Sequence, residues 1–175
     1  NVVRTRITQK GQIEVLNTGF SVFIGEGAGA SDDLSNNWNV FVGHNAGNAN
    51  VSGWANTANG YTALYSNISG SFNTATGSQA LRSNTTGAGN TATGRGALFT
   101  NTSGQNNTAN GNYALRFNTT GNYSTANGTF ALYNNTTGND NTANGYQALY
   151  LNTTGNFNSA NGYAALLSNT TGISN

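Results

Sequence analysis

The stretch NTANGYTALYSNISGSF (Asn56–Phe72) is followed at once by NTATGSQALRSNTTGAG (Asn73–Gly89), and both are 17 residues long. They agree at the third position (Ala), the fifth (Gly), the eighth and ninth (Ala-Leu), the twelfth (Asn) and the fifteenth (Gly). Seven such units run without a gap from Asn56 to Ser174, preceded by a looser unit at Asn39–Ala55 and an 18-residue relative at Ser21–Trp38. A short fixed period is typical of proteins in which each repeat stacks on the next.

The composition of the unit favours a β-solenoid over a helical repeat. A period of 17 residues is too short for a pair of helices, and Asn, Gly and Thr disfavour helix interiors. We expect each coil to contain a short strand (Asn56–Asn59), a glycine corner (Gly60), a second strand (Tyr61–Ser66) and a polar turn. The sequence therefore predicts an all-β fold, a parallel β-solenoid or β-roll of about nine coils of 17–18 residues over residues 21–175.

Positions that never vary across the seven strict units are the candidates for core and corners. The predicted core residues are Ala58, Ala63, Leu64, Ala80, Leu81, Leu98, Leu115, Leu132, Leu149 and Leu166. The predicted corner and turn residues are Gly60, Gly77, Gly94, Asn67, Asn84, Gly70 and Gly87. Adjacent strand residues point to opposite faces. The fixed Ala63–Leu64 pair therefore predicts either a strand buried on both faces, one of them by a second subunit, or a local turn.

Residues 1–20 differ in character from the repeats. VVRTRITQKGQIEVLNTG (Val2–Gly19) alternates apolar or β-branched residues with polar ones and has a turn signal at Lys10–Gly11, which predicts a β-hairpin. The segment holds four charged residues, Arg4, Arg6, Lys10 and Glu14. We expect it to act either as a cap on the first coil or as a docking strand for another subunit. The repeat runs unchanged into the final NTTGISN, which favours an end open to a further coil.

Composition excludes several classes of function. Only 6% of residues are charged and the net charge is +1. We therefore expect no nucleic-acid partner and no polybasic membrane patch. No apolar run approaches the roughly 20 residues of a membrane span. The absence of cysteine removes disulfides and thiolate metal sites from consideration and fits an extracellular protein.

The unit NTANGYQALYLNTTGNF (Asn141–Phe157), together with SVFIGEGAG (Ser21–Gly29) and NVFVGHNAG (Asn39–Gly47), resembles a known class of repeat. It is similar to the Asn-Thr-Ala-x-Gly repeats of large secreted bacterial surface proteins and of phage tail fibres. A more distant similarity is to the head repeats of trimeric autotransporter adhesins. The resemblance covers residues 21–175 and implies a parallel β-roll, often trimeric, with an extracellular fibrous or adhesive role.

Catalytic chemistry has no foundation in the sequence. His44 takes a place filled by Glu26 in the preceding unit and Tyr61 in the next, which indicates a surface residue. Asp32 and Asp33 lie in the longer turn of the 18-residue unit, and two adjacent carboxylates are weak evidence for calcium. We therefore predict a protein that is not an enzyme and has no catalytic, cofactor or metal site.

The sequon Asn-x-Ser/Thr recurs in the same turn of successive units. Its candidate glycosylation sites include Asn84, Asn101 and Asn118. The alternative, which turn chemistry favours, is that Asn and Thr simply form the turn.

Two columns of small polar residues define a candidate flat binding face. Its members include Thr74, Thr76, Thr91, Thr93, Thr108 and Asn110. Thr76, Thr93 and Asn110 stand at the repeat position that Ile24 and Val42 fill in the first two units, and the other three residues form a second column. Polar residues at these positions suit either an amide ladder or a solvent-exposed face. A regular uncharged array of this kind suits ice binding. The aromatic residues Tyr61, Tyr65, Tyr146, Tyr150 and Tyr163 are candidates for stacking on sugars.

The sequence thus predicts a secreted structural protein that assembles with itself into an extracellular fibre or filament, either head to tail or as a homotrimer. The alternatives are a trimeric tail-fibre or adhesin segment that binds surface glycans, and an ice-binding protein.

Overall fold

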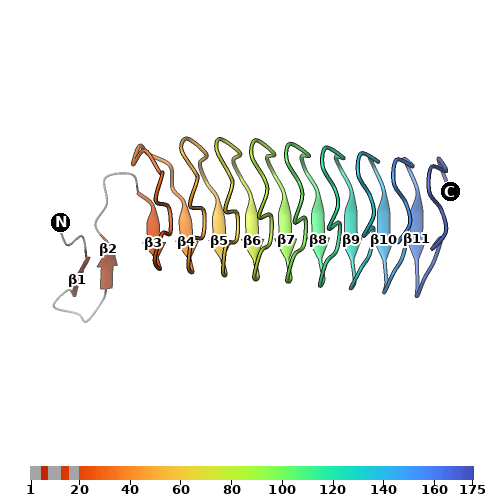
Figure 1. Cartoon of the computed structure of the whole chain (residues 1–175), viewed down its shortest axis with the longest axis horizontal. Helices are drawn as coiled ribbons and strands as arrows, with labels where there is room; N and C mark the ends of the chain where they lie inside the picture. The colour runs from red at the N-terminus through yellow and green to blue at the C-terminus, as the bar shows by residue number, and fades with distance from the viewer. Residues whose placement is uncertain (1–4, 8–12, 16–19) are drawn as a thin grey trace.

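The computed structural model describes residues 5–7, 13–15 and 20–175 of the chain. Nine short strands lie side by side in chain order and form one parallel sheet (Figure 1). The strands are β3 (Val22–Ile24), β4 (Val40–Val42), β5 (Thr57–Asn59), β6 (Thr74–Thr76), β7 (Thr91–Thr93), β8 (Thr108–Asn110), β9 (Thr125–Asn127), β10 (Thr142–Asn144) and β11 (Ser159–Asn161). The described chain has no helix. The predicted parallel β-solenoid is confirmed.

The pairing of the strands explains the strict period. Val22 lies opposite Val40, an 18-residue step, and Val40 lies opposite Thr57, a 17-residue step that recurs to the end of the sheet. Ala58 consequently stacks on Ala75, and each column of the repeat becomes a row along the rod. A glycine follows each strand of the sheet. Gly60, for example, has a φ of 144°, a backbone conformation that residues with a side chain rarely adopt.

The predicted second strand at Tyr61–Ser66 is wrong, because this segment is a series of turns. Thr62 and Leu64 adopt left-handed φ angles of 49° and 53°. The Thr62 N–H donates to His44 O in the preceding coil, and the Leu64 N–H donates to Ala80 O in the following coil, both at 2.9 Å. This backbone turns Ala63 and Leu64 inward together, and both are fully buried within one chain. A second subunit is not needed to cover either residue.

The core is a row of alanine and leucine side chains inside the coils. Ala58, Ala63, Leu64, Ala80, Leu81, Leu98, Leu115, Leu132 and Leu149 are all 0% exposed. Leu166 departs from the prediction and is 39% exposed, because no coil of this chain lies over it. Phe41 is also fully buried and stacks on Phe23 with ring centroids 5.4 Å apart, so the first coils use aromatic residues where later coils use alanine.

The predicted N-terminal hairpin is present in the described part of residues 1–20. Strands β1 (Thr5–Ile7) and β2 (Ile13–Val15) pair antiparallel, with Thr5 opposite Val15 and Ile7 opposite Ile13. The predicted turn at Lys10–Gly11 lies outside the described residues. Whether the hairpin is a cap or a docking segment stays a prediction.

Candidate functional site

The outer face of the parallel sheet carries the two predicted polar columns. In strands β5 to β11 the middle alanine is buried, and the first and third residues lie toward solvent. The exposed members of the predicted set are Thr74, Thr76, Thr93 and Asn110, and the half-buried members are Thr91 and Thr108. The columns therefore form an outer surface that bears hydroxyl and amide groups and no charge.

Only part of this face is a regular threonine array. Threonine occupies both columns in β6 and β7 alone, where Thr74, Thr76, Thr91 and Thr93 form a two-by-two group. Farther along, the third strand residue is asparagine, and these amides bond to each other. Asn110 donates to Asn127 at 3.0 Å, and the same bond recurs twice more, ending at Asn161. These amides direct part of their hydrogen bonding along the rod rather than toward water.

A buried row of asparagines occupies the polar turn, at the sequon position. The Asn67 Nδ2 donates to Asn50 Oδ1 at 2.7 Å and to Gly70 O at 2.8 Å, so both of its N–H groups are used within the rod. The same bonds recur at Asn84, Asn101 and Asn118, all 0% exposed. Folded coils thus leave these amide nitrogens inaccessible to a glycosyltransferase, and the residues form the turn instead.

The turn glycines are required by close packing. A Cβ on Gly70 would collide with Gly87 O, and one on Gly87 would collide with Gly104 O. The corner glycines Gly60, Gly77 and Gly94 combine a positive φ with a similar contact to the next coil. Both sets fall where the sequence places corners and turns, and both let successive backbones approach closely.

A second buried row begins at Ser21, whose Oγ accepts from the Asn39 N–H at 2.9 Å, and places a polar side chain before each strand of the sheet. The Asn73 N–H donates to Asn56 Oδ1 at 2.9 Å, and equivalent bonds continue to Asn175. Both rows end at one carboxylate in the first unit. Asp32 Oδ2 accepts from Asn39 Nδ2 at 3.1 Å and from Asn50 Nδ2 at 3.2 Å. Asp32 therefore accepts from the first asparagine amide of each row.

Asp33 lies in the same turn as Asp32 but accepts no hydrogen bond from either asparagine row. Its Oδ1 accepts from the backbone N–H of Ser35 and from Asn37 Nδ2, each at 2.9 Å. The hydrogen bonds from Ser35 and then that from Asn37 hold the pKa of the Asp33 carboxyl below its ordinary value. Within the described residues, no group of three or more His, Cys, Asp or Glu residues is placed to hold a metal ion.

A continuous row of arginines and aromatic rings runs along one edge of the solenoid. We call it the arginine–aromatic ladder. Arg82 lies between Tyr65 and Phe99, with its guanidinium carbon 5.4 and 5.7 Å from the two ring centroids. The Arg116 guanidinium lies 4.7 Å from the Phe99 ring and 4.5 Å from the Tyr113 ring. Arg95 lies on Tyr113 at 5.3 Å, and the Arg116 guanidinium also lies 5.5 Å from the Phe117 ring, which joins Phe117 to the ladder.

Aromatic pairs extend the ladder toward the C-terminus. Tyr113 stacks on Phe130 at 5.8 Å, and Tyr133 stacks on Tyr150 at 5.1 Å with an interplanar angle of 1°. Phe130 contacts both Tyr146 and Tyr150 edge-on. Of the tyrosines singled out in the sequence, Tyr65, Tyr146, Tyr150 and Tyr163 join this system, whereas Tyr61 stacks on the exposed His44 at 5.5 Å.

The ladder was not recognised from the sequence. Arg82, Phe99 and Arg116 share the tenth position of their units, and Tyr113 and Phe130 share the seventh. At the tenth position an arginine, an aromatic residue and an arginine follow one another in three consecutive units, which is a signal of the ladder in the sequence. The contacts between the seventh and tenth positions depend on the left-handed turn that joins them, which residue types alone do not reveal.

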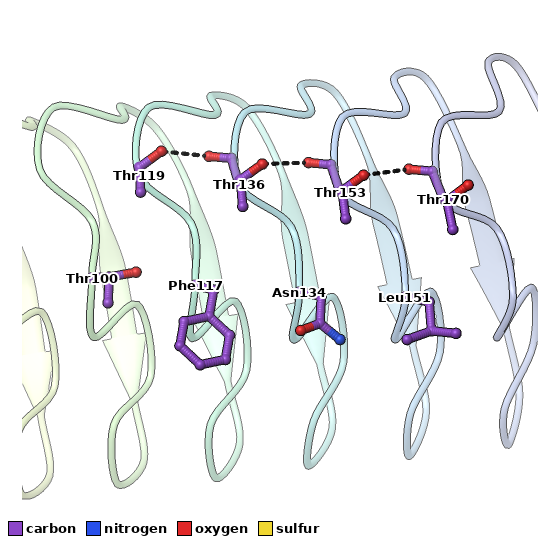
Figure 2. A pocket seen from close by; sticks show the side chains of 8 residues that line it. All are labelled: Thr100, Phe117, Thr119, Asn134, Thr136, Leu151, Thr153 and Thr170. Carbon is purple, nitrogen blue, oxygen red and sulfur yellow. Dashed lines mark hydrogen bonds between the residues drawn. The ribbon is translucent and has the colours of Figure 1, made fainter.

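A groove adjoins the ladder at Phe117, whose ring contacts Arg116. Figure 2 shows the residues that line it. The groove has a volume of about 570 Å³ and is lined by Thr100, Phe117, Thr119, Asn134, Thr136, Leu151, Thr153 and Thr170. The Thr119 hydroxyl donates to Thr136 O at 3.0 Å, and Thr136 donates in the same way to Thr153 O. Because these hydroxyls bond to backbone, the threonine methyl groups, Phe117 and Leu151 make the groove mostly apolar.

No family model, curated protein or solved structure matches the chain. The described residues include no helix that is long and apolar enough to cross a membrane.

Proposed function

We propose that the chain is a non-enzymatic structural subunit of an extracellular fibre, in which coils of neighbouring copies stack on one another. The observation that carries this proposal is that one interface, with the same register, joins every pair of strict coils from β5 to β11. A surface that binds a copy of itself along a single direction extends without closing.

The C-terminal coil presents the same interface without a partner. Leu166 is 39% exposed, whereas Leu149 in the preceding coil is buried. Gly145 lies so close to Gly162 O that a Cβ would collide, whereas nothing lies within 4 Å of a Cβ placed on Gly162. This face is suited to receive a further coil of the same kind, whether from the same polypeptide or from a second copy.

The resemblance to secreted surface and tail-fibre repeats is consistent with this role. The nearly uncharged surface and the chain of hydrogen bonds between coils suit a stiff extracellular rod. A homotrimer is the alternative assembly, and sedimentation of the same samples distinguishes the two.

Negative-stain electron microscopy of the purified chain in neutral buffer tests the proposal. We expect long filaments of uniform width. In Leu166→Lys a charge replaces an apolar side chain that a further coil must bury, so this variant should give short discrete rods. Tyr146→Lys is the matched control, because Tyr146 stays 42% exposed although a coil of the chain lies on either side of it, and this variant should still form filaments. Discrete rods from all three proteins would contradict the proposal.

Ice binding is a second candidate function, favoured by the threonine group on β6 and β7. Recrystallisation of ice in the presence of the wild type and of Thr76→Tyr tests it, with Ser78→Tyr as the control outside the sheet face. Equal inhibition by the two variants, or none by the wild type, would rule out this face.

A further inference from the structure

The arginine–aromatic ladder contains every arginine of residues 20–175. Arg82, Arg95 and Arg116 lie in three neighbouring coils, and each guanidinium group lies over at least one aromatic ring. Their side chains make no hydrogen bond or ion pair within the described residues, and Arg116 Nη1 is buried without an acceptor. The three positive charges are therefore not neutralised within the described chain.

The carboxylate side chains of residues 20–175 belong to other parts of the solenoid. Glu26, Asp32 and Asp33 belong to the first unit, and Asp140 lies in the turn before β10. The ladder consequently forms a local positive strip on a rod that carries few charges. Arg95 is exposed and Arg82 and Arg116 are half-buried. Guanidinium groups bind carboxylate and sulfate oxygens through paired N–H donors, and a positive strip that reaches solvent attracts anions.

The aromatic members supply the second part of a binding surface. Tyr113, Phe117 and Tyr133 keep part of their rings accessible, and flat apolar rings of this type stack on the apolar faces of sugar rings. The strip repeats at the spacing of the coils, about 4.8 Å per rung. A ligand that follows it must itself be linear and repetitive, with both apolar faces and negative groups.

We propose that the arginine–aromatic ladder binds an acidic polysaccharide, a linear chain of sugar rings bearing carboxylate or sulfate groups, along the axis of the rod. Three cations are fewer than the roughly 6–10 phosphates that a protein can contact on double-stranded DNA, which carries one charge per about 1.7 Å, so the strip suits a polymer whose charges lie farther apart than those of a duplex. This inference goes beyond the proposed fibre, since the ladder is complete within one chain and does not require further stacking.

Isothermal titration of the wild-type chain tests the ligand class. The probes are oligogalacturonate, which bears only carboxylate groups, a carrageenan oligosaccharide, which bears only sulfate groups, neutral dextran and an oligothymidylate. We expect binding to at least one acidic saccharide that weakens as salt is added, and no binding to dextran. The tighter of the two acidic saccharides identifies carboxylate or sulfate as the preferred group. Equal binding to dextran, tighter binding to the oligothymidylate, or no binding to either acidic saccharide would overturn the proposal.

A ladder variant tests the site. Arg82→Leu, Arg95→Asn and Arg116→Tyr together replace each arginine by a residue that another unit has at the same position, as at Leu167, Asn112 and Tyr133. We expect the affinity to fall on the order of tenfold or more, from three surface ion pairs. The control Thr57→Glu, Thr91→Glu and Thr125→Glu lowers the net charge by the same amount on the sheet face and should bind like the wild type. Equal losses in both variants, or unchanged affinity in the ladder variant, would overturn the assignment to the ladder.

Discussion

At the residue scale, the corner glycines meet two separate demands. Gly94 has a φ of 127°, and a Cβ placed on it would lie 2.6 Å from Gly111 O in the next coil. Gly162 has a similar φ of 123° but no atom within 4 Å of that Cβ. The chain therefore offers two glycines in which backbone conformation and packing against the next coil can be separated.

We predict that Gly94→Ala destabilises the rod by about 3–4 kcal/mol, since strained φ and overpacking each cost roughly 1–3 kcal/mol. Gly162→Ala should cost only about 1–2 kcal/mol, from strain alone. Urea unfolding followed by circular dichroism provides the comparison. Equal effects of the two substitutions would show that contact with the next coil contributes nothing at the corner.

The stability of the turn in the first unit depends on the ionisation of the Asp33 carboxyl, and therefore on pH. Its lowered pKa means that the hydrogen bonds from Ser35 and Asn37 stabilise the folded turn above the ordinary aspartate pKa of about 4. That contribution is lost as pH falls through the lowered value. We predict that tryptophan fluorescence from Trp38 and Trp54 changes below about pH 4. Asp33→Asn should weaken this dependence, whereas Asp140→Asn, several coils away, should leave it intact.

At the element scale, the turn row and the sheet-face row of asparagines differ in their access to water. Asn101 is fully buried, donates to Asn84 at 2.8 Å and accepts from Asn118 at 2.8 Å. Asn127 has the same kind of partners, Asn110 and Asn144, on the outer face of the sheet. The two rows have similar geometry, and water can replace a lost partner only in the second.

We predict that Asn101→Ala destabilises the protein by about 3 kcal/mol, because it leaves one buried donor and one buried acceptor unpaired. Asn127→Ala should cost about 1 kcal/mol or less. Hydrogen exchange of the neighbouring coils, measured by mass spectrometry, reports where each loss acts. A larger effect at Asn127 would contradict the distinction.

Within each coil, the strand and the corner can be predicted from the sequence, whereas the turn segment after the corner cannot. The strand, the glycine corner and the core rows follow from the period, because register places like residues on like and a column that keeps Ala or Leu must be buried. The Tyr61–Ser66 segment was misassigned because Thr62 and Leu64 adopt left-handed conformations that neither residue type favours. The bonds of these residues to the adjacent coils maintain a backbone that local propensity does not predict. The ladder was missed for the same reason.

At the scale of the whole molecule, each coil pairs only with the coil before it and the coil after it. Stability in such a molecule is close to a sum of repeat and neighbour contributions. Deleting Asn107–Tyr123 removes one complete unit and leaves the register between the remaining coils unchanged. Deleting 107–122 instead removes 16 residues and leaves Tyr123 as an extra residue between two units, so the residues on either side of the junction no longer stack on their equivalents.

We predict that the 17-residue deletion folds with the wild-type circular dichroism spectrum per residue and a slightly lower melting temperature. The 16-residue deletion should melt well below it, because buried asparagines and leucines at the junction lose their partners. Thermal melts of both proteins decide the matter. Similar melting temperatures would show that the register is not the source of cooperativity.

In the asparagine row of the turn, each amide nitrogen from Asn67 to Asn169 donates to the asparagine of the coil before, so each amide oxygen from Asn50 to Asn152 accepts from the coil after. The interior is thus a one-way array of parallel dipoles, closed at its nitrogen end by Asp32. Bringing two C-terminal faces together would set oxygen against oxygen in the middle of the contact. Association of two rods through their C-terminal faces is therefore unfavourable. A filament built by stacking these coils has two different ends, so it is polar and its two ends can grow at different rates.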